Sequence, residues 1–123
     1  MKDYGKEVII DLHECDPAMF NRVNIEAFFI DLCNKIGMER QDLHFWDDLD
    51  TPEDEKQVEP HLVGTSAIQF ILTSNITIHT LDLLKRVYIN VFSCKDFESV
   101  IVTKCATHWF LGIVVSMREI RRI

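Results

Sequence analysis

The sequence lacks the features that mark several large classes of protein. It contains no run of about 18 apolar residues, which a membrane-spanning helix needs. It has only 13 basic residues against 20 acidic ones, a formal net charge of −7, whereas a general nucleic-acid binder needs clustered Lys and Arg. No N-terminal signal peptide is apparent, because Lys2, Asp3, Lys6 and Glu7 interrupt any apolar stretch. We therefore expect a cytoplasmic protein that binds neither a membrane nor nucleic acid.

Motifs for metals, phosphates and disulfides are missing as well. The sequence has no glycine-rich phosphate loop, no paired-histidine metal motif and no nucleophile elbow. Neither a Cys-x-x-Cys pair nor zinc-finger spacing occurs among its four cysteines, which are Cys15, Cys33, Cys94 and Cys105. In a reducing compartment these are expected to be free thiols, and such a cysteine is ordinarily a small core residue. We expect no metal site.

What is present is the pattern of one α+β domain over residues 1–123. The hydrophobic share of 47 % and the charged share of 27 % are typical of a soluble globular protein. β-Branched residues and period-two alternation predict strands, and recurrence every three to four residues predicts helices. The predicted strands are 6–13, 42–46, 64–73, 74–81, 86–94 and 113–120, and the predicted helices are 16–37 and 97–111.

Capping residues are expected at the ends of both helices. Asp16 is predicted to cap the first helix, with Pro17 at its first position and Gly37 at its end. Asp96 is predicted to cap the second helix, which ends at Gly112. The apolar face of the first helix is predicted to comprise Phe20, Val23, Ala27, Phe28, Ile30 and Leu32.

The order of these elements predicts the fold. The acidic stretch 47–60 is expected to be a loop, and the other elements follow as β-α-β-β-β-β-α-β. Strands that follow one another directly indicate an antiparallel sheet, with both helices on one face, so the predicted fold is a two-layer α+β sandwich. The uncovered face of such a sheet is partly apolar, and we expect a homodimer that buries it.

Four residues have side chains suited to nucleophilic and acid–base chemistry. They are Ser66, Ser74, His79 and Cys94. Strand alternation places Cys94 on the more polar face of its strand, with Tyr88, Asn90 and Phe92. Residue types alone do not distinguish a site from ordinary surface and core positions.

The segments around these residues resemble a known family. They are Gly5 through Asp16, Gly64-Thr65-Ser66, Ser74-Asn75-Ile76-Thr77-Ile78-His79-Thr80 and Val91-Phe92-Ser93-Cys94. Ser66 and Ser74 are eight residues apart, His79 follows five later, and Cys94 fifteen after that. In order, spacing and residue type, these segments are similar to the small prokaryotic S-adenosylmethionine decarboxylase proenzymes, in pieces over residues 1–95.

The resemblance implies a self-processing enzyme. The chain would cleave itself between Thr73 and Ser74 into residues 1–73 and 74–123, and Ser74 would become a pyruvoyl cofactor that forms a Schiff base with the substrate amine. Ser66 and His79 would assist the cleavage. Cys94 would return a proton to the carbanion after decarboxylation. The implied role is decarboxylation of S-adenosylmethionine for spermidine synthesis.

Three departures from the family pattern bear on cleavage and on the substrate. Thr73 stands where the family usually has Glu, and Asn75 stands where it usually has His. After Ile-His-Thr the family usually has Trp-Pro-Glu, whose Glu holds the substrate ribose, but this chain has Leu81-Asp82-Leu83.

The candidate substrate-binding residues follow from these positions. Asp82 lies next to the ribose position, and Phe45 or Trp46 is the candidate for stacking on adenine. Two alternatives to S-adenosylmethionine decarboxylation stay open. The loss of the ribose carboxylate favours a pyruvoyl-dependent decarboxylase of a basic amino acid such as arginine or ornithine. Thr73 and Asn75 favour an uncleaved, non-catalytic relative that acts as a partner or regulator.

Overall fold

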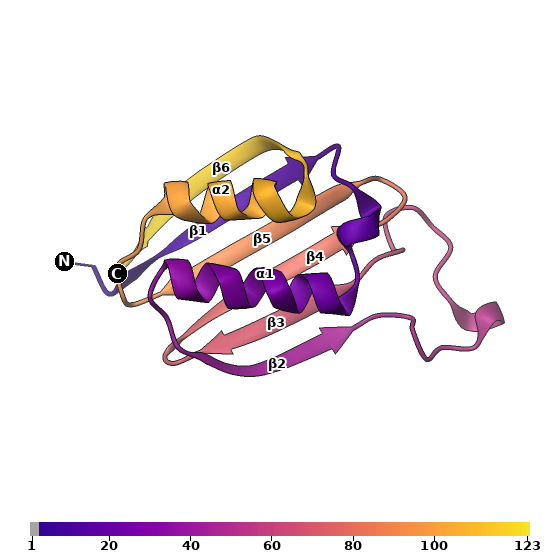
Figure 1. Ribbon diagram of the computed structural model, residues 1–123, viewed down its shortest axis with the longest axis horizontal. Helices are drawn as coiled ribbons and strands as arrows, with labels where there is room; N and C mark the ends of the chain where they lie inside the picture. The colour runs from indigo at the N-terminus through magenta and orange to yellow at the C-terminus, as the bar shows by residue number, and fades with distance from the viewer. Residues whose placement is uncertain (1–2) are drawn as a thin grey trace.

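The computed structural model describes residues 3–123, and its central feature is a six-stranded sheet with two helices on one face (Figure 1). The strands are β1 (Gly5–His13), β2 (Arg40–Trp46), β3 (Ser66–Ile71), β4 (Ser74–Leu81), β5 (Arg86–Ser93) and β6 (Ile113–Arg122). The helices are α1 (Arg22–Lys35) and α2 (Ser99–Phe110). The strand order is β2-β3-β4-β5-β1-β6, and every neighbouring pair is antiparallel. The predicted two-layer sandwich is confirmed.

Strand alternation divides the sheet into a helix-covered face and a second face, here called the open face. On β5, Val87, Ile89 and Val91 are buried under the helices, whereas Tyr88 and Asn90 point the other way and are half-exposed. The same period of two runs through β3 and β4. On these three strands the open face consists of Ser66, Ile68, Phe70, Asn75, Thr77, His79, Tyr88, Asn90 and Phe92.

The helices bury one apolar stripe each against the other face. In α1 the buried side chains are Ile25, Phe28, Phe29, Leu32 and Cys33, and in α2 they are Val102, Cys105, Ala106 and Phe110. The rings of Phe28 and Phe110 meet edge to face with centroids 5.0 Å apart, which joins the two helices. The predicted apolar face of α1 was partly wrong. Val23 is 77 % exposed and Ile30 is 40 % exposed, because they lie outside the stripe of α1 that faces the sheet.

The first helix begins later than its capping signals predicted. Asp16 accepts a hydrogen bond from the Ala18 N–H at 3.0 Å, but this caps only a short 3₁₀ turn, Pro17–Met19. The chain then turns at Phe20, which is buried. Asn21 is the N-cap of α1, and its side chain accepts from the Asn24 N–H at 2.9 Å. Asn21, and not Asp16, is therefore the capping residue that marks the start of α1.

The ends of α2 also differ from the prediction. Asp96 does not cap it, because the helix starts after Glu98 and Asp96 pairs with Lys6 instead. At the other end Leu111, and not Gly112, adopts the left-handed conformation, with φ 55°. Gly112 is required for a different reason, since a Cβ there would lie 2.4 Å from the Cys15 sulfur. Gly37, by contrast, ends α1 with φ +68°, as predicted.

Candidate active site

The bond between Thr73 and Ser74 lies at the tip of a tight hairpin. Ile71 of β3 pairs with Ser74 of β4, so only Leu72 and Thr73 form the turn. Thr73 has φ 63°, in the left-handed region that β-branched residues rarely occupy. Such a conformation costs about 1–2 kcal/mol for a residue with a Cβ. The backbone is therefore strained at the residue before Ser74.

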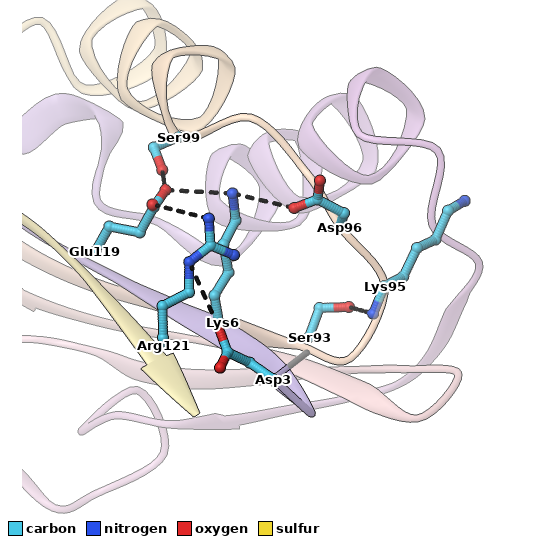
Figure 2. A network of polar contacts seen from close by, with 8 residues as sticks. All are labelled: Asp3, Lys6, Ser93, Lys95, Asp96, Ser99, Glu119 and Arg121. Atoms are coloured by element: carbon cyan, nitrogen blue, oxygen red, sulfur yellow. Dashed lines mark hydrogen bonds and ion pairs between the residues drawn. The ribbon is translucent and has the colours of Figure 1, made fainter. Parts of the chain in front are cut away.

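Ser74 is held by a partner that sequence reasoning did not identify. Its side chain lies on the helix-covered face and is 7 % exposed. The Ser74 hydroxyl donates to Ser93 Oγ at 2.7 Å. Ser93 lies directly opposite on β5, is fully buried, and also accepts the Lys95 N–H at 3.0 Å, as Figure 2 shows. The orientation of the Ser74 oxygen is thus fixed by Ser93.

Cys94 lies beside the same turn. Its sulfur is 3.4 Å from Thr73 Oγ1 and 3.9 Å from the Thr73 carbonyl oxygen. The structure therefore brings together Cys94 and the Thr73–Ser74 bond, as the resemblance implied. It does so at the end of β5 and not across a shared face, because Ser74 points to the helix-covered side while Cys94 follows the last residue of the strand.

A pocket of about 300 Å³ opens beside Ser74. Its lining includes Ser74, Thr73 and Ser93 from the hairpin side and Gly37, Glu39 and Lys95 from the facing loops. The Lys95 ammonium donates to the Gly37 carbonyl, which connects the loop after β5 to the end of α1. The pocket gives a small molecule access to Ser74.

A buried lysine anchors the loop that carries Cys94 and Lys95. Lys6 of β1 pairs with Ser93 and is only 5 % exposed. Its ammonium lies 3.4 Å from Asp96 and 3.2 Å from Glu119, in the network drawn in Figure 2. Ser74, Ser93 and Lys6 form one row across three neighbouring strands. The sequence does not reveal this row, because Lys6 joins it only through the pairing of β1 with β5.

Ser66 and His79 form a second, separate pair. Ser66 Oγ lies 2.6 Å from His79 Nδ1, on the open face. His79 lies five positions after Ser74 on β4, about 17 Å along the strand. Within one chain neither Ser66 nor His79 contacts Ser74, so the structure does not bring all four predicted catalytic residues together.

The three candidate substrate-binding residues also lie apart. Trp46 is 56 % exposed and pairs with Ser66 at the edge of the open face. Phe45 points to the other side, where the Arg22 guanidinium lies 5.6 Å from its ring centroid. Asp82 follows β4 and lines a larger pocket at the end of the sheet. None of the three lines the pocket beside Ser74.

The other three cysteines are core residues. Cys15, Cys33 and Cys105 are each at most 2 % exposed. Burial raises the pKa of the Cys15 and Cys33 thiols to about 11 and that of Cys105 to about 12.

In residues 3–123, no three His, Cys, Asp or Glu side chains gather into a possible metal site. None of the helices in that range combines the length and apolarity needed to cross a bilayer.

Known proteins resemble this chain in both sequence and fold. The family model for S-adenosylmethionine decarboxylase matches residues 6–123. The S-adenosylmethionine decarboxylase proenzyme of Clostridium kluyveri is 27 % identical over 97 residues, which cover 78 % of this chain and 68 % of that protein. The crystal structure of the adenosylmethionine decarboxylase from Aquifex aeolicus shares the fold, with TM-score 0.72 at 16 % identity, over 100 % of this chain and 94 % of the other. This chain belongs to the S-adenosylmethionine decarboxylase family.

Proposed function

We propose that this protein is a self-processing, pyruvoyl-dependent decarboxylase of S-adenosylmethionine, in the cytoplasmic route to spermidine. The observation that supports this best is the hairpin tip. A strained Thr73 precedes Ser74, the Ser74 hydroxyl is oriented by a buried hydrogen bond, and the Cys94 thiol lies against the same turn. Family membership supports decarboxylation as the activity, and the hairpin tip is where the cofactor would form.

The cleavage begins with an acyl shift at the hairpin. Ser74 Oγ forms a bond to the Thr73 carbonyl carbon, the bond from that carbon to the Ser74 nitrogen breaks, and the hydroxyl proton finally resides on that nitrogen. Ser93 Oγ accepts the Ser74 hydrogen bond and would orient the attacking oxygen before its proton passes to the Ser74 nitrogen. Strain at Thr73 favours the shift, since the broken peptide no longer holds Thr73 at positive φ.

The ester then breaks by elimination and hydrolysis. The Ser74 Cα proton is taken by a base, expected to be His79, the Ser74 Cβ–Oγ bond breaks, Thr73 leaves as a carboxylate and the Ser74 residue becomes dehydroalanine. One water enters and one ammonia leaves, and residues 74–123 begin with a pyruvoyl group. The position fits that group, because Ser74 lines the 300 Å³ pocket and its side chain is held away from bulk water.

A pyruvoyl group, once formed, supplies the carbonyl that draws electrons from the substrate during loss of CO₂. The residues around it would do the rest. Cys94 would deliver a proton, and the position of its sulfur within 4 Å of the Thr73 oxygens supports this role. Lys6 and Asp96 hold the loop that positions Cys94 and Lys95.

The separate Ser66–His79 pair supports the proposed homodimer. The open face presents Trp46, Ile68 and Phe70, which are 56 %, 40 % and 44 % exposed. We propose that the two copies pack with their open faces together, about a two-fold axis that lies between the sheets and runs perpendicular to β4. This packing would cover these side chains, and β4 of one copy would run opposite to β4 of the other. The His79 end of one chain would then lie over the Thr73–Ser74 turn of its partner. In such a dimer, His79 of one copy would supply the histidine that the turn of the other copy needs.

The test is the intact mass of freshly made protein, with Ser74→Ala as the control. We expect two species, residues 1–73 and residues 74–123 with a pyruvoyl end, whose masses sum to the whole chain plus one water minus one ammonia. The processed protein should release CO₂ from carboxyl-labelled S-adenosylmethionine and not from arginine or ornithine. A chain that stays intact on long incubation would overturn self-processing and favour the non-catalytic alternative.

A further inference from the structure

The loop between β5 and α2 carries the Cys94 thiol. It comprises residues 94–98, the whole connection between the two elements. The Cys94 sulfur lies 3.4 Å from Thr73 Oγ1, so a shift of this loop would move the thiol relative to the Thr73–Ser74 bond. The contacts that hold the loop therefore decide where the thiol lies.

The start of β1 lies against the beginning of this loop. Lys6 pairs with Ser93, the last residue of β5. Gly5 comes so close that a Cβ on it would lie 2.3 Å from the Ser93 carbonyl oxygen and 2.8 Å from the Cys94 Cα. A side chain has no room there, so the absence of a Cβ at Gly5 lets the Cys94 backbone rest on β1.

The Lys6 side chain contacts the middle of the loop and reaches its far end. Its ammonium lies 3.4 Å from the Asp96 carboxylate and 4.7 Å from the centroid of the Phe97 ring. It also lies 3.2 Å from Glu119 of β6, and the same Glu119 oxygen accepts the Ser99 hydroxyl at the start of α2 (Figure 2). One residue of β1 is thus connected to the loop along its whole length.

These contacts depend on the charge of Lys6. The residue is 5 % exposed, whereas the Asp96 side chain is 74 % exposed. A lysine this deeply buried is rare unless it is paired, because its ammonium loses most of its hydration. Replacing a buried ion pair by an apolar side chain of similar size is often neutral or stabilising, so the stability of the fold alone does not explain the charge.

The network lies on the helix-covered face of the sheet. Lys6 shares the side of β1 that carries Val8 and Ile10, both of which are buried under the helices. The proposed dimer packs the open faces together, so it leaves this network within one chain. Lys6 and the Cys94 thiol that it holds therefore belong to the same copy.

We propose that Lys6 is a positioning residue for the Cys94 thiol, which its ammonium holds beside the Thr73–Ser74 bond through Asp96. The inference rests on the proposed function, because it gives Lys6 a part in proton delivery by Cys94. Lys6 does not line the pocket beside Ser74 and is not expected to contact the substrate. Lys6→Met should therefore lower kcat for decarboxylation at least about fivefold and leave KM within about twofold.

The first measurement uses the Ser74→Ala chain, which stays whole whether or not the unaltered protein cleaves itself. Iodoacetamide at pH 8 alkylates Cys94, and peptide mapping compares its rate with those of the buried Cys33 and Cys105. Lys6→Met in this background should let Cys94 react at least about threefold faster, while the two buried cysteines stay slow. An unchanged Cys94 rate would overturn the inference. Equal acceleration of all three cysteines would also overturn it, because it would show general destabilisation.

Two more variants keep the test decisive if Lys6→Met folds poorly. Asp96→Asn changes an exposed side chain without altering its shape, and it should speed Cys94 labelling as Lys6→Met does. Both changes together should add nothing further, because they remove the same ion pair. Lys35→Met removes another lysine ion pair, with Asp31 at 2.9 Å, and should leave the Cys94 rate unchanged. An unaltered rate in Asp96→Asn, or a raised one in Lys35→Met, would refute the role of the Lys6–Asp96 pair.

The kinetic measurement separates this inference from the proposed function. If Lys6→Met exposes Cys94 but the unaltered protein releases no CO₂ from S-adenosylmethionine, the proposed function fails and Lys6 still positions the thiol. If the unaltered protein is active and Lys6→Met keeps its full kcat, the part of Lys6 in proton delivery is refuted.

Discussion

Replacing Ser93 by alanine should slow self-cleavage while leaving the nucleophile in place. The substitution removes the acceptor of two hydrogen bonds, one from the Ser74 hydroxyl at 2.7 Å and one from the Lys95 N–H at 3.0 Å. Each buried donor left without a partner costs roughly 1–3 kcal/mol. Much of that cost lowers the stability of the folded chain and not the cleavage rate, because the unpaired donors are present both before the reaction and in its transition state.

The part that affects the rate comes from orientation. Without Ser93 the Ser74 side chain is free to leave the rotamer that its hydrogen bond selects. We expect a barrier higher by roughly 1.4–2.8 kcal/mol, which corresponds to about 10- to 100-fold slower cleavage. The assay is a cell-free translation chase, with the fraction of intact chain followed by mass spectrometry.

Two further variants separate orientation from general destabilisation. Thr80→Val removes an equally buried hydroxyl of β4, which accepts the Thr65 N–H, but it does not touch Ser74. It should lower the melting temperature and leave the cleavage rate nearly unchanged. Ser93→Thr keeps a hydroxyl and should restore much of the rate. The reasoning is refuted if Ser93→Ala cleaves at the original rate, or if Thr80→Val slows cleavage as much.

Three other results are expected. Thr73→Gly removes the left-handed strain and should slow cleavage several-fold, while in a Ser74→Ala background it should raise the melting temperature; faster cleavage would contradict a role for strain. Iodoacetamide at pH 8 should label Cys94 far ahead of Cys33 and Cys105, because burial raises the thiol pKa of Cys33 to about 11 and that of Cys105 to about 12. Comparable labelling of all three in peptide mapping would contradict the burial of Cys33 and Cys105. Co-expression of His79→Ala with Ser74→Ala chains should yield cleaved His79→Ala chain if His79 acts from the partner copy, and no cleavage at all would rule that arrangement out.

Sequence patterns predicted elements more reliably than their ends. Alternation along 86–94 correctly separated Val87, Ile89 and Val91 from Tyr88 and Asn90, because the side-chain period of a strand needs no knowledge of its neighbours. The caps were harder. Asp16 and Asp96 are sound capping residues locally, but a buried Phe20 and the ion pair with Lys6 gave them other roles.

The candidate site residues could also be predicted in part: the sequence indicates which residues they are, but not which of them meet. Types and spacings along the chain were enough to select Ser66, Ser74, His79 and Cys94, because a motif is a property of linear order. Which of them meet depends on strand register and on which face each side chain takes. Register brought Ser93 and Cys94 to the Thr73–Ser74 turn, and it sent Ser66 and His79 to the other end of β4.

The sequence by itself determined the fold class and the chemical types at the site, since these depend on local pattern and on order along the chain, and its resemblance to a known family indicated the candidate cleavage bond. Only the tertiary structure decided that Ser93 orients the Ser74 hydroxyl, that Lys6 anchors the neighbouring loop, and that Asp82 Oδ1 is buried without a hydrogen-bond partner. The physical reason is that hydrogen bonding and desolvation depend on atoms far apart in the chain, whose proximity is set by the pairing of strands and the packing of helices.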